Sequence, residues 1–202
     1  MGPSILVPMD HPVLGNLDWM AWNLILAAVP AALAVALFRR SARRGAAWWV
    51  GVLVFVAFLP NAPYVLTDAV HMPADLRATE GSGLATAAVV GLYASFAIAG
   101  FVAYAFSLLR LGNYLRGAGV AAGVAFAVEF GLHGLAAVGI VLGRVFRFNS
   151  WDLLTRPEAV LDTVIWPQRE RMVAIVVFLV VALALGTMAV RAALTRVRLI
   201  RL

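Results

Sequence analysis

Five apolar runs are the feature that most constrains this chain. They cover residues 19–38, 46–60, 84–109, 118–142 and 172–190. A helix needs about 20 apolar residues to cross the hydrocarbon core of a bilayer. Only 13% of the residues are charged, whereas a soluble domain carries about 25%. We therefore predict an all-α, polytopic transmembrane helix bundle of about five spans, with residues 1–202 forming a single integral membrane domain.

Two missing residue types narrow the chemistry. The chain has no cysteine, and all 16 basic residues are arginine. Thiolate nucleophiles, zinc–sulfur sites and a lysine Schiff base to retinal are therefore excluded. The sequence also contains no phosphate-binding glycine loop and no dinucleotide fingerprint, so we expect no nucleotide cofactor. Its pI of about 11.0 does not indicate nucleic acid binding, because the arginines lie at the ends of the apolar runs.

The distribution of arginine predicts the orientation of the spans. One set of flanks carries no acid, and the opposite set carries nine of the ten acids. The acid-free flanks contain Arg39, Arg40, Arg43, Arg44, Arg110, Arg116, Arg191, Arg196, Arg198 and Arg201. Because cytoplasmic flanks are enriched in arginine, we place the N-terminus outside and the C-terminus inside. Polar segments 61–83 and 143–171 then face outward, with Trp19 and Trp22 as interface anchors and a short interfacial helix over 155–166.

The outer end of the second run contains the first candidate site. Two prolines, Pro60 and Pro63, break the helix there, and the freed backbone needs partners such as the amide of Asn61. If helix resumes, four polar side chains at spacings of three and four share one face. They are Tyr64, Thr67, Asp68 and His71. The alternative interpretation is a kink followed by a solvated loop helix.

An acid and a histidine lie within the fourth run. Glu129 is about midway along it, and His133 follows one helical turn later. A charge there must be protonated, paired or exposed to water. Together with Asp68 and His71 they offer ligand types suited to a divalent metal such as zinc or iron. The alternatives are a proton-handling pair or a hydrogen bond that fixes helix packing.

The third candidate follows the fourth run. Arg144 and Arg147 are three residues apart, and Asn149 and Asp152 come next. Guanidinium groups suit a phosphate or a carboxylate, so we expect this segment to bind an anionic group. The alternative is an arginine and aromatic belt in which Arg144 pairs with Asp68 or Asp152.

These motifs resemble a known family. The run Leu-Pro-Asn-Ala-Pro-Tyr at 59–64 with Thr67, Asp68 and His71, followed by Gly-Arg at 143–144, Arg147 and Asn-Ser-Trp-Asp at 149–152, is similar to the bacterial multi-pass membrane family catalogued as domain of unknown function 1361. The resemblance covers nearly the whole chain. It implies a small bacterial integral membrane protein and no particular activity. We expect the protein in the cytoplasmic (inner) membrane.

Three functions are compatible with these observations. The first is a membrane-embedded hydrolase or transferase open to the outer face, acting on a lipid or lipid-linked anionic substrate with Asp68, His71 and His133 as metal ligands or acid–base groups. The second is a small oligomeric transporter or channel that uses Glu129. The third is a structural or assembly subunit of a membrane complex. In it the glycine pairs 119/123 and 139/143 would serve helix packing.

Overall fold

The structure is a computed structural model that describes residues 17–39, 44–79, 81–147, 169–200 and the single residues 155, 156 and 158. Over these residues the chain consists of helices and connecting turns, without a strand. Five helical segments are long and apolar enough to cross a membrane, which confirms the predicted fold class. The long helices are α2 (Leu17–Leu37), α3 (Ala46–Phe58), α6 (Gly83–Gly117), α7 (Ala122–Val145) and α10 (Arg169–Ile200).

Three of these helices differ most in extent from the apolar runs. Helix α6 continues past Arg110 to Gly117, and α10 continues past Val190 to Ile200, because arginine is a good helix former and does not end a helix. Helix α7 begins at Ala122 instead of residue 118. Gly119 has a φ of 80°, so the chain turns there. Hydropathy therefore predicts where each span lies, but it does not predict that α6 and α10 continue into the charged residues that follow.

The second span is interrupted where the prolines predict it. Helix α3 ends at Phe58, and the chain continues through α4 (Asn61–Tyr64), the 3-10 helix η1 (Val65–His71) and α5 (Met72–Arg77). Asn61 Nδ2 donates to the carbonyl oxygen of Phe58 at 3.1 Å, so the side chain satisfies a freed backbone group as expected. The segment from Ala46 to Arg77 together counts as one candidate span.

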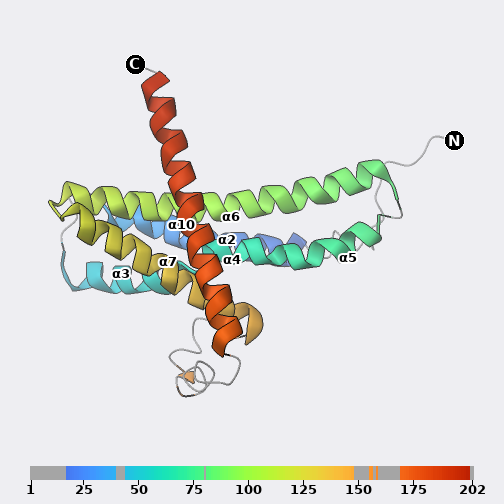
Figure 1. Ribbon diagram of the computed structural model, residues 1–202, viewed down its shortest axis with the longest axis horizontal. Helices are drawn as coiled ribbons and strands as arrows, with labels where there is room; N and C mark the ends of the chain where they lie inside the picture. The colour runs from blue at the N-terminus through green and yellow to red at the C-terminus, as the bar shows by residue number, and fades with distance from the viewer. Residues whose placement is uncertain are drawn as a thin grey trace.

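Helix α6 is the central element of the packing. It contacts α2, α4, η1, α5 and α7, and it runs almost the full length of the molecule in Figure 1. Its buried residues Tyr104 and Leu108 are fully shielded. Helix α10 packs against α7 and α6 and crosses them steeply in Figure 1. Large apolar side chains on the outer surfaces, such as Leu84 and Phe178, are exposed, as expected for helices surrounded by lipid.

Glycines allow two close helix contacts. A Cβ at Gly100 would lie 2.7 Å from the carbonyl oxygen of Ala62, and a Cβ at Gly139 would lie 2.7 Å from Cβ of Pro60. The predicted role of residue 139 in packing is therefore confirmed. The prediction is wrong for Gly119, which lies in a turn, and for Gly123, which has open space around it.

Candidate functional site

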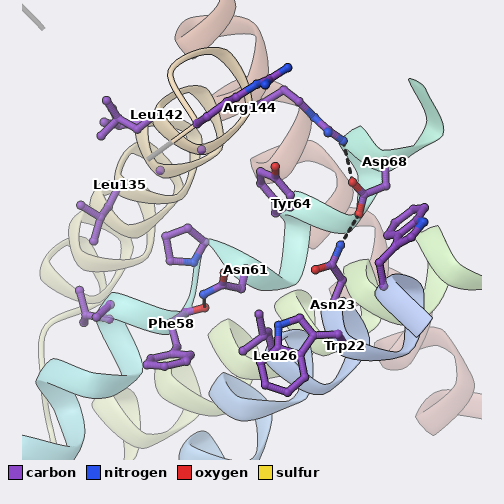
Figure 2. Close-up of a pocket in the computed structure, with 18 of the residues that line it drawn as sticks. Trp22, Asn23, Leu26, Phe58, Asn61, Tyr64, Asp68, Leu135, Leu142 and Arg144 are labelled. Atoms are coloured by element: carbon purple, nitrogen blue, oxygen red, sulfur yellow. Dashed lines mark hydrogen bonds and ion pairs between the residues drawn. The ribbon is translucent and has the colours of Figure 1, made fainter. Parts of the chain in front are cut away.

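A pocket of about 1040 Å³ lies between α2, the segment from α3 to η1, and α7 (Figure 2). Ligand pockets usually measure roughly 300–1,000 Å³. Six of the side chains selected from the sequence line it: Asn61, Tyr64, Asp68, His71, Arg144 and Arg147. The structure thus brings two separate motifs, the broken second span and the end of the fourth, to one site.

An ion pair connects the two motifs. Arg144 Nη2 lies 2.7 Å from Asp68 Oδ1, and Arg144 Nε donates to Thr67 Oγ1 at 3.1 Å. Asn23 of α2 donates through Nδ2 to Asp68 Oδ2 at 3.0 Å, so three helical segments meet at this carboxylate (Figure 2). The pairing of Arg144 with Asp68, predicted from the sequence as the alternative to anion binding, is therefore present. Asp68 is buried and has both oxygens satisfied, as a buried charge requires.

The 3-10 geometry of η1 sets the direction of its polar side chains. Residues three apart are eclipsed in a 3-10 helix, so Asp68 and His71 lie one above the other. Tyr64 precedes them and also faces the pocket. The guanidinium carbon of Arg144 lies 5.0 Å from the centroid of the Tyr64 ring, which is a cation–π contact. Three of the four side chains predicted to share a face, Tyr64, Asp68 and His71, therefore line the pocket. Thr67 is not part of the lining, and its hydroxyl donates to the carbonyl oxygen of Tyr64 at 2.6 Å.

Arg147 differs from Arg144 in its backbone and its partners. Helix α7 ends at Val145, so Arg147 lies beyond the helix, and its φ is 57°, in the left-handed region. It is exposed and lines the pocket. Within the part of the chain that the structure describes, it forms no ion pair. Its guanidinium is therefore available to a ligand.

The rest of the pocket wall is apolar. Figure 2 shows Trp22 and Leu26 of α2 on one side and Leu135 and Leu142 of α7 on the other. Trp19 and Trp22, expected as interface anchors, contribute to this wall. The Trp19 ring lies 5.3 Å from the His71 ring, centroid to centroid. One end of the pocket is therefore polar and cationic, while the remainder suits hydrocarbon.

Glu129 and His133 lie outside the pocket lining and have separate partners. His133 Nδ1 is 2.7 Å from the hydroxyl of the buried Tyr104. Glu129 pairs with Arg116 of α6 at 3.3 Å and with Arg191 of α10. The expected direct Glu129–His133 interaction is replaced by these contacts. Glu129 lies in the second turn of α7 instead of midway along a span, because α7 begins at Ala122.

The four proposed metal ligands do not come together. Asp68 and His71 line the pocket, whereas Glu129 and His133 contact α6 and α10. Among the described residues, no group of three or more histidine and acidic side chains could hold a metal ion. Asn149 and Asp152, together with most of the expected interfacial helix over 155–166, lie outside the described residues.

Several polar partners were not singled out from the sequence. Asn23 holds Asp68, and Tyr93 donates its hydroxyl proton to the buried Asp75 at 2.7 Å. Asn23 stands within an apolar span, so the rule that intramembrane polar residues need partners could have identified it. The pairing of Tyr93 with Asp75 gives no such signal, because 18 residues and a turn separate them.

Comparison with known proteins identifies a family and nothing beyond it. The family described as "Protein of unknown function (DUF1361)" matches residues 22–185, which include both motifs of the pocket. No curated protein matches the chain, and no solved structure does.

Proposed function

Because the chain belongs to the family DUF1361, whose description assigns no activity, and has five helices able to span a membrane, we propose a function from the pocket itself. The protein binds an anionic lipid or lipid-linked molecule, with the anionic head at Arg144 and Arg147 and the apolar part along the wall. The observation that carries this proposal is the composition of one continuous pocket, which is cationic at one end and apolar elsewhere.

The charge of the polar end supports an anionic ligand. Two arginines and one aspartate line it, so these three side chains together carry a net positive charge. Arg144 is already held by Asp68 and Thr67, which fixes its position. Arg147 supplies the charge without an acidic partner in the described part of the chain. Arginine forks recognise phosphate and carboxylate oxygens in pairs.

The arginine distribution supports an outward-facing site in an inner membrane. Arg44 donates to the hydroxyl of Tyr114 at 2.8 Å, so two arginine-rich flanks meet at the end of the fold opposite the Arg144 end. If that end is cytoplasmic, the pocket opens toward the extracytoplasmic side. Its ligand then comes from the outer leaflet or from the space beyond it.

A chemical step on the bound lipid is the second candidate. His71 lines the pocket and makes no hydrogen bond or ion pair within the described residues, so it is free to act as a general acid–base group. A hydrolase or transferase would use it beside the fixed Asp68. The predicted result is product formation from phosphatidylglycerol vesicles, lost in His71→Asn with lipid binding retained.

Lipid binding by purified protein tests the main proposal. Native mass spectrometry in detergent would compare phosphatidylglycerol with zwitterionic phosphatidylcholine. We expect wild type to prefer phosphatidylglycerol roughly tenfold, because a hydrogen bond to a charged group contributes about 1.5–3 kcal/mol. Arg147→Gln should lose the preference. Arg110→Gln, which removes an exposed arginine outside the pocket, should keep it. Equal binding of both lipids by wild type would refute the proposal.

A further inference from the structure

The pocket has a direction and a depth that specify its occupant more closely. Leu135 and Arg144 both line it and lie on one uninterrupted helix, α7. They are two and a half turns apart, which corresponds to about 13 Å along the axis. One leaflet contributes about half of the roughly 30 Å hydrocarbon core. The apolar part of the pocket therefore matches the depth of a single leaflet.

The apolar part is also open sideways. Leu53 of α3, Trp22 of α2 and Leu135 of α7 line the pocket, yet they remain 68%, 60% and 43% exposed. Helices α3 and α7 each pack mainly on other helices, and the chain of the second span meets α7 through α4. Pro60 of that chain lies against Gly139 and forms the closed side. The apolar part is thus a slot that faces the bilayer, named here the α3–α7 slot and lined by Leu53, Val56, Leu135 and Val138.

The polar end limits the charge of the occupant. Asp68 neutralises Arg144 through their 2.7 Å ion pair, so one positive charge remains, on Arg147. A dianionic head would bring one charge more than this end compensates. A monoanionic head, such as a phosphodiester, balances it.

We propose that the occupant is a monoanionic phospholipid that enters from the bilayer, with its phosphodiester at Arg147 and one hydrocarbon chain in the α3–α7 slot. This proposal rests on the proposed function, to which it adds the head-group charge, the chain position and the route of entry. The occupant is therefore a membrane lipid, because a soluble phosphate would need neither the depth of the pocket nor its lateral opening.

Blocking the slot without changing the head site tests the proposal. Val138→Trp fills the slot from α7. Val124→Trp is the matched control, because it changes an exposed valine of the same helix outside the pocket. Leu53→Trp fills the slot from α3 and provides a second variant if Val138→Trp fails to fold. The probes are dioleoyl and dihexanoyl phosphatidylglycerol, measured with purified full-length protein by native mass spectrometry.

The two proposals predict different patterns. We expect Val138→Trp and Leu53→Trp to weaken dioleoyl binding at least tenfold and to leave dihexanoyl binding within twofold of wild type. Val124→Trp should change neither. If Arg147→Gln weakens binding but both slot variants bind dioleoyl lipid normally, the chain position is wrong and the proposed function stands. If neither class of variant affects either probe, both proposals are refuted.

Discussion

Asp68 and Arg144, 76 residues apart in the chain, form an ion pair of 2.7 Å that joins η1 to α7 at the polar end of the pocket. The aspartate side chain is 3% exposed and the arginine side chain 29% exposed. The pair therefore has two consequences: it holds the broken second span against the fourth, and it fixes a guanidinium where a ligand can reach it.

Removing the arginine should destabilise the fold. In Arg144→Ala a buried carboxylate keeps Asn23 as a partner but loses its counter-ion, and breaking a buried pair costs about 3 kcal/mol. Thermal unfolding in detergent would measure the loss. Asp68→Asn in the Arg144→Ala background should recover part of it. An unchanged midpoint in Arg144→Ala would show that the pair is not structural.

Glu129 should hold α10 in place. Its carboxylate receives arginines from α6 and α10, so Glu129→Gln leaves two half-exposed guanidinium groups without a counter-ion. Because water screens such groups, we expect a loss of about 1–2 kcal/mol. Hydrogen exchange should rise selectively along α10. Glu170→Gln, which changes an exposed acid in the first turn of α10, is the control and should have no such effect.

The buried tyrosine of α6 should depend on its hydrogen bond. Tyr104 is fully buried, and its hydroxyl bonds to His133 at 2.7 Å, so Tyr104→Phe leaves the imidazole nitrogen unpaired at a cost of about 1–2 kcal/mol. Tyr114→Phe removes a hydroxyl that bonds to the exposed Arg44, and its effect should be close to zero. Denaturation of the two variants under one condition compares them directly. Equal losses would contradict the assignment.

Two glycines should respond oppositely to the same substitution. A Cβ at Gly100 would meet the backbone oxygen of Ala62 and the side chain of Val65, both at 2.7 Å, so Gly100→Ala should cost about 1–3 kcal/mol through overpacking. Gly131 has open space around it within α7, and Gly131→Ala should gain about 0.5–1 kcal/mol of helix stability. Thermal unfolding measures both. A neutral Gly100→Ala would mean that α4 and α6 can separate.

The orientation can be tested with single cysteines, since the chain has none of its own. Ser82 precedes α6, and Ala118 follows it at the opposite end. We expect a membrane-impermeant maleimide to label Ser82→Cys in intact cells and to label Ala118→Cys only after lysis. The reverse pattern would overturn the orientation inferred from the arginines.

The sequence predicts the number of spans and the proline break because both follow from local rules. Hydropathy over about 20 residues identifies a span, and Pro60 with Pro63 removes backbone donors wherever the chain lies. The polar face of Tyr64, Asp68 and His71 follows from their spacing. These features need no knowledge of which helices are neighbours.

The partners across helices were not predictable in this way. In the sequence, Arg116 and Arg191 are interpreted as charges that flank the membrane spans. In the structure, both pair with Glu129 from other helices. Their pairing depends on the rotation and inclination of α6 and α10, which hydropathy does not encode. The left-handed backbone of Arg147 has no sequence signal either, since glycine and asparagine are the residues expected at such a position.

The carboxylate of Asp68 in η1 is paired with an arginine of α7, and this pairing has a consequence for biosynthesis. Asn23 and Asp68 are made early, but Arg144 follows only after the third span and most of the fourth. A nascent chain that ends before Arg144 therefore has an acidic pocket end. Arg144 neutralises it, and Arg147, just past the end of α7, then makes it positive. The ability to attract an anion is thus acquired late in synthesis, directly after the residue that neutralises Asp68.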